Sequence, residues 1–370
     1  MKILPERLAL FLPGLYEGGA ERIALNLAKG IAARGYTVDL VLARAEGPYM
    51  EQIPDDVRLV DLHAPRVLGS IPALTRYLRQ ERPTAMISAL FSNVIALWAR
   101  RLSGVPCRLI ITEQNNLSSL VNNKSDARWK LYPSLAGWFY GWADNIIAVS
   151  NYVAEDLAKI AGIPLDMIQV VYNPIVTSDL HEKAEAPLSH PWFNNSGTPV
   201  VVAVGRLTDQ KAFDTLIRAF SLVRKKQQAH LLLIGEGENR SALQSLIKHL
   251  ELDEDVSLIG YVQNPYPFVK QASLFALPSR WEGLPTILVE ALYLGTPIVA
   301  TDCPGGSREI LKNGLYGRLV QVDDPLGLAE AIILSLQEGR PWRPRESWEP
   351  FHLDVVLDRY VELLFGANNA

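Results

Sequence analysis

Two carboxylates and two cations in the second half of the chain have the residue types and spacing best suited to chemistry. Glu282 and Glu290 are separated by seven residues, and Glu290 stands in the apolar run Ile287–Leu294. An ionised carboxylate among apolar neighbours needs a paired cation or hydroxyl donors, and the vicinal hydroxyls of a sugar would serve. Arg206 and Lys211 could bind a diphosphate through bidentate and point-charge contacts. Taken singly, each of the four also fits an ordinary solvated charge.

The two glutamates lie where a strand is expected to give way to a helix. That strand should end at Leu277, and Pro285 fits the first turn of the helix that contains Glu290. A helix N-terminus offers free N–H groups and the positive end of the helix dipole, and both favour a phosphate beyond the carboxyl edge of a parallel sheet. Arg206 and Lys211 follow another expected strand. The sequence therefore predicts an anion site on strand-to-helix connections.

Two glycine-rich turns also follow expected strands. Gly18 and Gly19 open the first expected helix, where glycine would permit positive φ angles and close approach of the backbone to a ligand. A plain tight turn is the alternative. Gly235 and Gly237 supply only two of the three glycines of the dinucleotide-binding fingerprint. Neither turn combines that fingerprint with an acidic residue about 20 positions on, which argues against a dehydrogenase.

Short runs of β-branched and aliphatic residues alternate with longer helical patterns along almost the whole chain. This alternation is typical of βα units and parallel sheets. The expected strands of the first half are Arg7–Leu12, Thr37–Leu42, Val57–Leu62, Thr84–Ser88, Arg108–Thr112, Asn145–Ala148 and Ile168–Tyr172. Those of the second half are Val200–Gly205, Leu231–Gly235, Val256–Gly260, Leu274–Leu277, Ile298–Ala300 and Gly317–Val320. Expected helices of the first half are Ala20–Ala33, Pro72–Gln80, Val94–Leu102, Ala127–Trp142 and Val153–Ala161.

A change in composition separates the two series of elements. The pattern stops at Asn173, and a polar segment rich in Pro, Asn and Gly continues to Pro199. A chain of 370 residues exceeds what one hydrophobic core usually serves, so this segment is the best candidate for a hinge. After Pro350 the pattern Leu353–Leu364 predicts a closing helix with one apolar face, which must pack on another element.

Charge and cysteine content exclude several classes of function. The formal net charge is −4, and the first half is only slightly basic, which is too weak a balance for nucleic acid but leaves room for an anionic or lipid-phosphate acceptor. Cys107 and Cys303 form no CxxC or Cys/His cluster, so neither a disulfide framework nor a zinc site is indicated, and a reducing cytoplasm fits. No stretch reaches the roughly 18 apolar residues of a spanning helix.

Taken together, these segments closely resemble the retaining GT-B glycosyltransferases of family 4, and the likeness spans nearly the whole chain. The resemblance implies an α/β protein with two Rossmann-like domains that face a central cleft. Residues 1–173 plus 350–370 would form the acceptor-side domain, completed by the closing helix as a crossover. Residues 174–349 would form the domain that binds the nucleotide-sugar donor.

The resemblance also implies an activity. The enzyme would move a hexose or N-acetylhexosamine, with retention of configuration, from a nucleoside-diphosphate sugar to a hydroxyl of a glycan or lipid-linked acceptor. A UDP-sugar is favoured, in the synthesis of cell-surface polysaccharide or glycoconjugates. Neither a cofactor nor a metal is expected, since the nucleotide-sugar is itself a substrate. The enzyme would act in the cytoplasm or at the inner face of the cell membrane.

The same resemblance gives the motif residues their roles. Arg206 and Lys211 would neutralise the donor diphosphate, Glu282 would approach the donor sugar, and Glu290 would bind the ribose hydroxyls. The remaining donor-side positions are Gly18 and Gly19 near the phosphates, the amides of Gly283 and Leu284, and Tyr261 and Val262 near the base. Gly305, Gly306, Arg308 and Glu309 look like the last donor-side loop, and Arg308 is also a candidate for the acceptor side.

One departure from the family pattern concerns the loop after the strand Arg108–Thr112. Many relatives place a histidine there that faces the donor sugar, whereas this chain has Glu113, Gln114, Asn115 and Asn116. Glu113, Gln114 or Asn115 would take its place, as an acid/base or as a hydrogen-bonding group, and Asn116 also falls on the acceptor side. A polar loop that merely lines the cleft is the alternative.

The segment 129–142 contains six aromatic residues, with Leu135, Trp138, Phe139 and Trp142 at helical spacing. Lys124, Arg128 and Lys130 lie at or just before its start. Such a patch could contact a membrane peripherally and receive a lipid-linked acceptor. A helix packed into the core of its own domain is the alternative.

Two other functions are consistent with the same donor chemistry. A GT-B nucleotide-sugar epimerase would release altered or hydrolysed donor without any acceptor. A non-catalytic protein that binds nucleotide-sugar is favoured by the missing histidine. The presence of Arg206, Lys211, Glu282 and Glu290 argues against that non-catalytic function.

Overall fold

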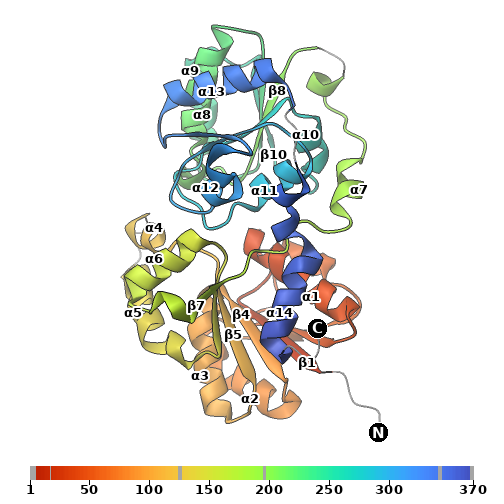
Figure 1. Ribbon diagram of the computed structural model, residues 1–370, viewed down its shortest axis with the longest axis vertical. Coiled ribbons are helices and arrows are strands. Elements are labelled where there is room, and N and C mark those ends of the chain that lie inside the picture. The colour runs from red at the N-terminus through yellow and green to blue at the C-terminus, as the bar shows by residue number, and fades with distance from the viewer. Residues whose placement is uncertain (1–5, 17, 124–126, 195–196, 341–343, 367–370) are drawn as a thin grey trace. The chain divides into compact units, whose positions relative to one another are not determined.

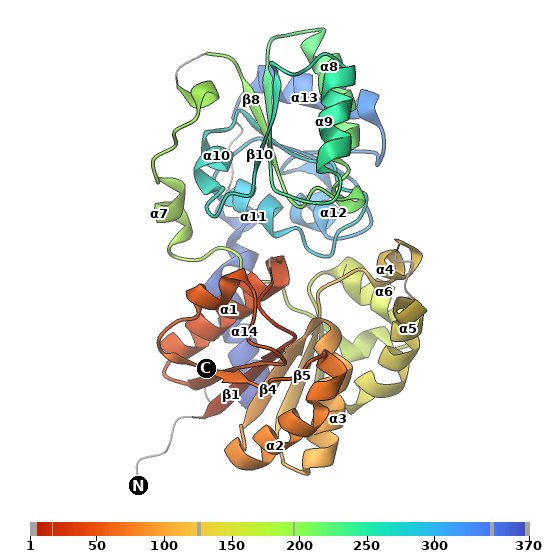
Figure 2. The same cartoon turned by 180° about the vertical axis from the view of Figure 1, so that it is seen from behind.

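The computed structural model describes residues 6–16, 18–123, 127–194, 197–340 and 344–366. The chain divides into two compact units, the first made of Met1–Ile175 with Phe351–Ala370 and the second of Val176–Pro350. Each unit is a parallel sheet with helices packed on it (Figure 1 and Figure 2). The chain leaves the first unit and returns to it at neighbouring points, because the N–H of Ile175 donates to the carbonyl of Phe351 at 3.0 Å.

The sheet of the first unit has seven strands in the order β3-β2-β1-β4-β5-β6-β7, all parallel. Four of them consist almost wholly of buried residues, as expected when helices cover both faces of a parallel sheet. The strands are β1 (Arg7–Leu12), β2 (Thr37–Leu42), β3 (Val57–Asp61), β4 (Ala85–Ala89), β5 (Arg108–Glu113), β6 (Asn145–Ala148) and β7 (Ile168–Val170).

The helices of the first unit, apart from the closing helix, connect these strands. They are α1 (Gly19–Ala33), α2 (Ile71–Glu81), α3 (Asn93–Ser103), α4 (Leu117–Asn123), α5 (Ala127–Phe139), α6 (Asn151–Ala161) and the closing helix α14 (Leu353–Phe365). Helix α14 lies beside α1 from the opposite end of the chain (Figure 1 and Figure 2). Its apolar face, which includes Val356, Leu357 and Tyr360, is buried. The closing helix therefore finds its packing partner in the first unit.

The sheet of the second unit has six parallel strands in the order β10-β9-β8-β11-β12-β13. They are β8 (Val200–Val204), β9 (His230–Ile234), β10 (Val256–Gly260), β11 (Leu274–Leu277), β12 (Ile298–Thr301) and β13 (Arg318–Val320). The helices are α7 (Leu180–Ala184), α8 (Phe213–Arg224), α9 (Arg240–His249), α10 (Tyr266–Gln271), α11 (Thr286–Tyr293), α12 (Ser307–Ile310) and α13 (Pro325–Glu338). Helices α8 and α13 pack together over a core that includes Phe213, Phe220 and Ile332.

The expectation of two Rossmann-like α/β folds is confirmed. Every expected strand is present with its ends displaced by at most two residues. The long helix expected over Ala127–Trp142 ends at Phe139 and continues as a single 3-10 turn, Tyr140–Trp142. Helix α4 was not expected, because it is only seven residues long and most of these residues are polar.

Candidate functional site

Strand order in the second unit singles out one place for a ligand. Strands β8 and β11 are neighbours in the middle of the sheet, and the order reverses between them. Loops that leave two such strands diverge to opposite faces of a parallel sheet and open a crevice at its carboxyl edge. Arg206 and Lys211 lie on the loop after β8, and Glu282 lies on the loop after β11. The predicted cations and carboxylate thus come from the two loops that border the crevice.

Lys211 and Glu282 form an ion pair at this point. The ammonium Nζ of Lys211 lies 2.6 Å from Oε1 of Glu282, and the two side chains are only 14% and 7% exposed. The Ser279 hydroxyl donates to the same carboxylate oxygen at 2.6 Å. Ala212, which follows Lys211, has a left-handed backbone with φ 47° and is fully buried, a conformation that costs an alanine about 1–2 kcal/mol. The ion pair therefore holds the ammonium beside the Glu282 carboxylate.

Arg280 joins the two loops and was not singled out from the sequence. Its guanidinium donates to the carbonyl of Asp209 at 2.7 Å and forms ion pairs with Asp214 at 3.0 Å and Asp323 at 2.8 Å. Its own backbone N–H donates to the carbonyl of Gln210 at 2.8 Å. The only signal in the sequence is that Arg280 lies two residues before Glu282. The loop that carries Lys211 is therefore fixed to the loop that carries Glu282.

The loop after β12 closes against the same region. The N–H of Glu282 donates to the carbonyl of Pro304 at 2.9 Å, and the N–H of Gly306 donates to the carbonyl of Gly283 at 2.8 Å. Gly305 has φ +140°, and a Cβ there would lie 2.3 Å from the backbone oxygen of Glu282. Any larger residue at this position would push the Glu282 loop away, so the glycine pattern has a structural cause.

Glu290 lies on α11 and is buried, with 1% of its surface exposed. Its Oε1 accepts a hydrogen bond from the hydroxyl of Tyr266 on α10 at 3.3 Å. Tyr266 is a further polar group that the sequence reasoning missed, since an isolated tyrosine carries no motif. Leu284, just before α11, is also buried. The carboxylate therefore has a hydroxyl donor beside it in the unit's interior.

Four other candidates, Arg206, Tyr261, Val262 and Arg308, have surroundings of their own. Arg206 is exposed, and its guanidinium approaches Gln210 at 3.5 Å. Tyr261 and Val262 follow β10 at the edge of the sheet, two strands away from β8, and Tyr261 is 48% exposed. Arg308 belongs to α12 in the second unit and forms an ion pair with Asp302, so it does not share a unit with the Glu113 loop.

The first unit has a corresponding reversal of strand order between β1 and β4. Gly18 and Gly19 follow β1 there, and neither adopts the positive φ angle that glycine would permit. Gly18 is the N-cap of α1 with an extended backbone, φ −141°, and Gly19 begins the helix. The chain enters α1 directly and needs no left-handed turn at either residue. A Cβ on Gly18 would meet the carboxylate of Glu21 at 2.2 Å, so the glycine leaves room for that side chain.

Glu113 ends β5 and points into the first unit. Its side chain is buried, with Oε1 accepting from the N–H groups of Gln114 at 3.1 Å and Asn115 at 3.2 Å. Its Oε2 accepts from the hydroxyl of Tyr140 at 3.2 Å, and Tyr140 in turn contacts Tyr132. Burial raises the pKa of Glu113 to about 7. Glu113 therefore organises the loop from within rather than presenting its carboxylate to solvent.

The three residues after Glu113 have different surroundings. Gln114 accepts a hydrogen bond from the amide of Asn173 at 3.0 Å. Asn116 is buried and caps α4, because its Oδ1 accepts from the N–H of Ser119 at 2.9 Å. Asn115 is partly exposed, and its side chain has no hydrogen-bond partner among the described residues. Asn115 is thus the member of the loop best placed to meet a ligand.

Two further properties bear on what the site can hold. No group of three or more His, Cys, Asp or Glu side chains is arranged for a metal ion within the described residues. Across the same residues, every helix is too short or too polar to cross a bilayer.

Comparison with known proteins agrees with this architecture. The family model for glycosyl transferases group 1 matches residues 188–349, and that for glycosyltransferase family 4 matches residues 17–179. An N-acetylgalactosamine-N,N'-diacetylbacillosaminyl-diphospho-undecaprenol 4-alpha-N-acetylgalactosaminyltransferase of Campylobacter jejuni is 29% identical over 90% of this chain and 91% of its own. The lipopolysaccharide core biosynthesis glycosyltransferase LpsE of Rhizobium meliloti is 26% identical over 94% of this chain and 96% of its own.

Among solved structures, Anabaena HepE in complex with UDP superposes with a TM-score of 0.74 over 97% of this chain and 99% of its own, at 20% identity. That likeness concerns the fold, which is GT-B. Together the two family models span both units, from residue 17 to residue 349. The chain therefore belongs to the group 1 glycosyltransferases.

Proposed function

We propose that this glycosyltransferase moves a hexose or N-acetylhexosamine from a nucleoside-diphosphate sugar, with a UDP-sugar as the favoured donor, to a hydroxyl group of a glycan or lipid-linked acceptor. The observation that carries the proposal is the Lys211–Glu282 pair, which lies where strand order reverses and next to the start of α11. An ammonium, a carboxylate and a helix N-terminus in one crevice suit a diphosphate attached to a sugar.

The donor's parts divide among these groups. An ammonium has three donors, of which the described residues use one, on Glu282, so Lys211 can also bind a phosphate oxygen. Arg206 and the amides of Gly283 and Leu284 complete the diphosphate site, and Glu282 accepts from a hydroxyl of the donor sugar. Glu290, with Tyr266 beside it, binds the ribose hydroxyls. Tyr261 and Val262 meet the base at the β10 edge.

Transfer in this scheme depends on positioning and electrostatics rather than on a buried nucleophile. Lys211, Arg206 and the start of α11 stabilise the departing nucleoside diphosphate. The acceptor hydroxyl then enters from the face that the diphosphate leaves, which retains the configuration of the sugar. In the first unit, Asn115 hydrogen-bonds the substrate in place of the family's histidine, and Glu113 positions Asn115 through its backbone N–H.

The roles named for two relatives support a function at the cell surface. The Campylobacter jejuni protein acts on a diphospho-undecaprenol-linked glycan, and the Rhizobium meliloti protein serves lipopolysaccharide core biosynthesis. We extend this to synthesis of cell-surface polysaccharide or glycoconjugate by the present chain. It would work from the cytoplasmic side, in peripheral contact with the membrane, and without a metal or other cofactor.

Donor screening followed by a product assay tests the proposal. UDP, GDP and ADP sugars are compared by thermal shift, and release of nucleotide is then followed with candidate acceptors. We expect a UDP-sugar to stabilise the protein most, and nuclear magnetic resonance of the product to show the anomeric configuration of the donor. Altered or hydrolysed donor at an undiminished rate without acceptor would favour an epimerase, and binding without turnover would favour a non-catalytic protein.

A further inference from the structure

A large cavity lies at the amino edge of the first unit's sheet. Its volume is about 770 Å³, and it is lined by Leu97, Arg100, Arg101, Gly104, Val105, Pro106, Cys107, Arg108, Trp142 and Asp144. Strand β5 begins at Arg108 beside the cavity and ends at Glu113, so the two are separated by about 17 Å at about 3.3 Å per residue. The cavity is therefore at the opposite edge of the sheet from the Glu113 loop.

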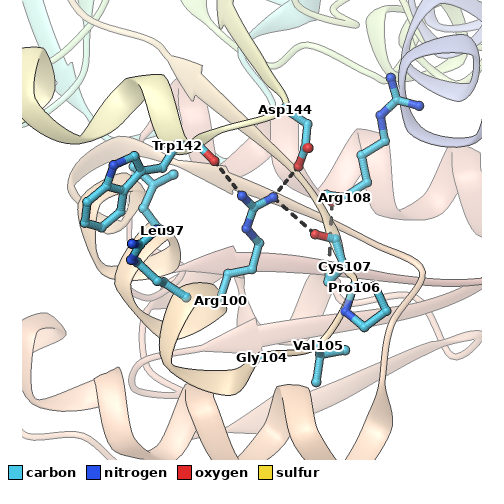
Figure 3. Close-up of a pocket in the computed structure, with 10 residues that line it drawn as sticks. Leu97, Arg100, Gly104, Val105, Pro106, Cys107, Arg108, Trp142 and Asp144 are labelled. Atoms are coloured by element: carbon cyan, nitrogen blue, oxygen red, sulfur yellow. Dashed lines mark hydrogen bonds and ion pairs between the residues drawn. The ribbon is translucent and has the colours of Figure 1, made fainter.

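The floor of the cavity is a fixed ion pair. The Arg100 guanidinium pairs with Asp144 and donates to the carbonyl of Trp142 at 2.5 Å and that of Cys107 at 3.4 Å (Figure 3). Asp144 also accepts from the N–H of Leu109 at 2.7 Å. The charges of Arg100 and Asp144 thus compensate each other, and their hydrogen bonds hold α3, β5 and the segment before β6 together.

Arg101 and Arg108 add two positive charges to the lining of the cavity. Both are exposed, and neither side chain has a carboxylate partner among the described residues. The Cζ atom of Arg101 lies 4.7 Å from the centre of the Trp142 ring. In Figure 3 the guanidinium of Arg108 points away from the Arg100 ion pair. With Arg100 balanced by Asp144, the lining carries two uncompensated positive charges.

An apolar rim continues from the cavity wall. The centroid of the Trp142 ring lies 5.0 Å from that of Phe139 and 5.1 Å from that of Trp98. The Phe139 centroid lies 6.4 Å from that of Trp138. Trp138 is 67% exposed, and Leu102, next to Arg101, is 51% exposed. Exposed indole and leucine beside unpaired arginines is the composition of a surface that sits at a membrane interface.

Helix α5 contributes one face to this rim and another face to the core of the unit. Tyr132, Ala136 and the following Tyr140 are buried, so a different face of the segment packs inside the unit. Of the cations expected to serve the membrane, Lys124 and the side chain of Arg128 lie outside the described residues, whereas Lys130 is exposed. The membrane and core alternatives for segment 129–142 therefore apply to different faces of it.

We infer that this basic cavity binds the phosphate of anionic phospholipid headgroups, while Trp138 and Leu102 enter the bilayer interface. The inference rests on the proposed membrane contact and specifies it, assigning the charge recognition to Arg101 and Arg108. It is independent of donor binding, which belongs to the second unit. Charge complementarity selects the occupant, since an anionic lipid surface supplies both phosphate and an apolar layer.

Vesicle binding tests the inference. Wild type and Arg101→Gln/Arg108→Gln are sedimented with vesicles of phosphatidylglycerol and phosphatidylcholine (1:3) and with pure phosphatidylcholine, across a range of salt. We expect binding to the anionic vesicles that weakens with salt, and a partition coefficient about 30-fold lower in the double variant, at about fivefold per surface arginine. Arg218→Gln/Lys225→Gln, which removes two exposed cations at α8, should bind as wild type does.

Two further measurements make the outcome decisive. Trp138→Ser should weaken binding to the anionic vesicles, whereas Leu326→Ser, at a 61% exposed leucine on α13, should not. Equal vesicle binding by wild type and Arg101→Gln/Arg108→Gln would overturn the inference, as would binding of inorganic phosphate without any binding of vesicles. A thermal shift with UDP, measured on the same variants, should be unchanged, so loss of donor binding would be recognised separately as a failure of the proposed function.

Discussion

Replacement of Lys211 by methionine removes the ammonium but keeps the aliphatic stem. The side chain of Glu282 is 7% exposed. Its carboxylate would then keep only the Ser279 hydroxyl as a side-chain hydrogen-bond donor among the described residues. Loss of one partner from a mostly buried ion pair costs about 3 kcal/mol of stability. If the ammonium also stabilises the departing diphosphate, its loss costs about another 3 kcal/mol in the transition state, or about a hundredfold in rate.

The double variant Lys211→Met/Glu282→Gln separates these two effects. It no longer leaves a carboxylate without its cation, so urea unfolding should show most of the lost stability restored. Donor-dependent nucleotide release should stay at least about a hundredfold below wild type, because the positive charge is still missing. Lys225→Met, at an exposed position after α8, controls for loss of a lysine. If activity returns together with stability, Lys211 is only a structural partner of Glu282 and the donor-site reasoning is refuted.

Three other residues give predictions of different kinds. Burial raises the pKa of Glu113 to about 7, above its value of about 4.3 in the unfolded chain. Its stabilising contribution is therefore greatest at low pH and is lost as the pH rises through 7. Relative to Glu113→Gln, wild type should lose about 2.5 kcal/mol of unfolding free energy between pH 5 and pH 8, and parallel pH profiles of the two proteins would exclude this. Gly305→Ala should lower both stability and donor affinity, because its Cβ would meet Glu282, whereas Gly295→Ala, with a positive φ of 70° but open space around it, should lower stability only. Arg280→Ala should raise KM for the donor about tenfold by freeing the two loops, about the effect of one charge-assisted contact; Arg280→Lys should recover part of it, and an unchanged KM in the alanine variant would show that the loops hold without Arg280.

Much of the fold follows from patterns that are local in the sequence. Buried strands such as Val200–Val204 and Arg108–Glu113 are short aliphatic runs between helical patterns, and this contrast fixes both their number and their ends closely. The closing helix was likewise expected from its apolar face. The order of strands in the sheet is not local information. It is the order that brings Lys211 next to Glu282, 71 residues away.

The sequence could not predict the role of a residue where that role depends on contacts with another element. Glu113 was a candidate to face the substrate, yet the Tyr140 hydroxyl and the backbone of its own loop hold it inside the unit. Arg280 carries no motif, and its importance comes from carboxylates contributed by distant segments. On α5 the spacing of Leu135 and Trp138 suggested the apolar face, but aromatic residues occur on most sides of this helix, so periodicity could not identify the buried one.

The position of the diphosphate in a crystal structure of the chain with bound UDP tests the central claim most directly. The account predicts phosphate oxygens within hydrogen-bonding distance of Lys211 Nζ, at the start of α11, with the ribose beside Glu290. Electron density for the nucleotide elsewhere on the protein, or its absence from this crevice at saturating UDP, would contradict the account.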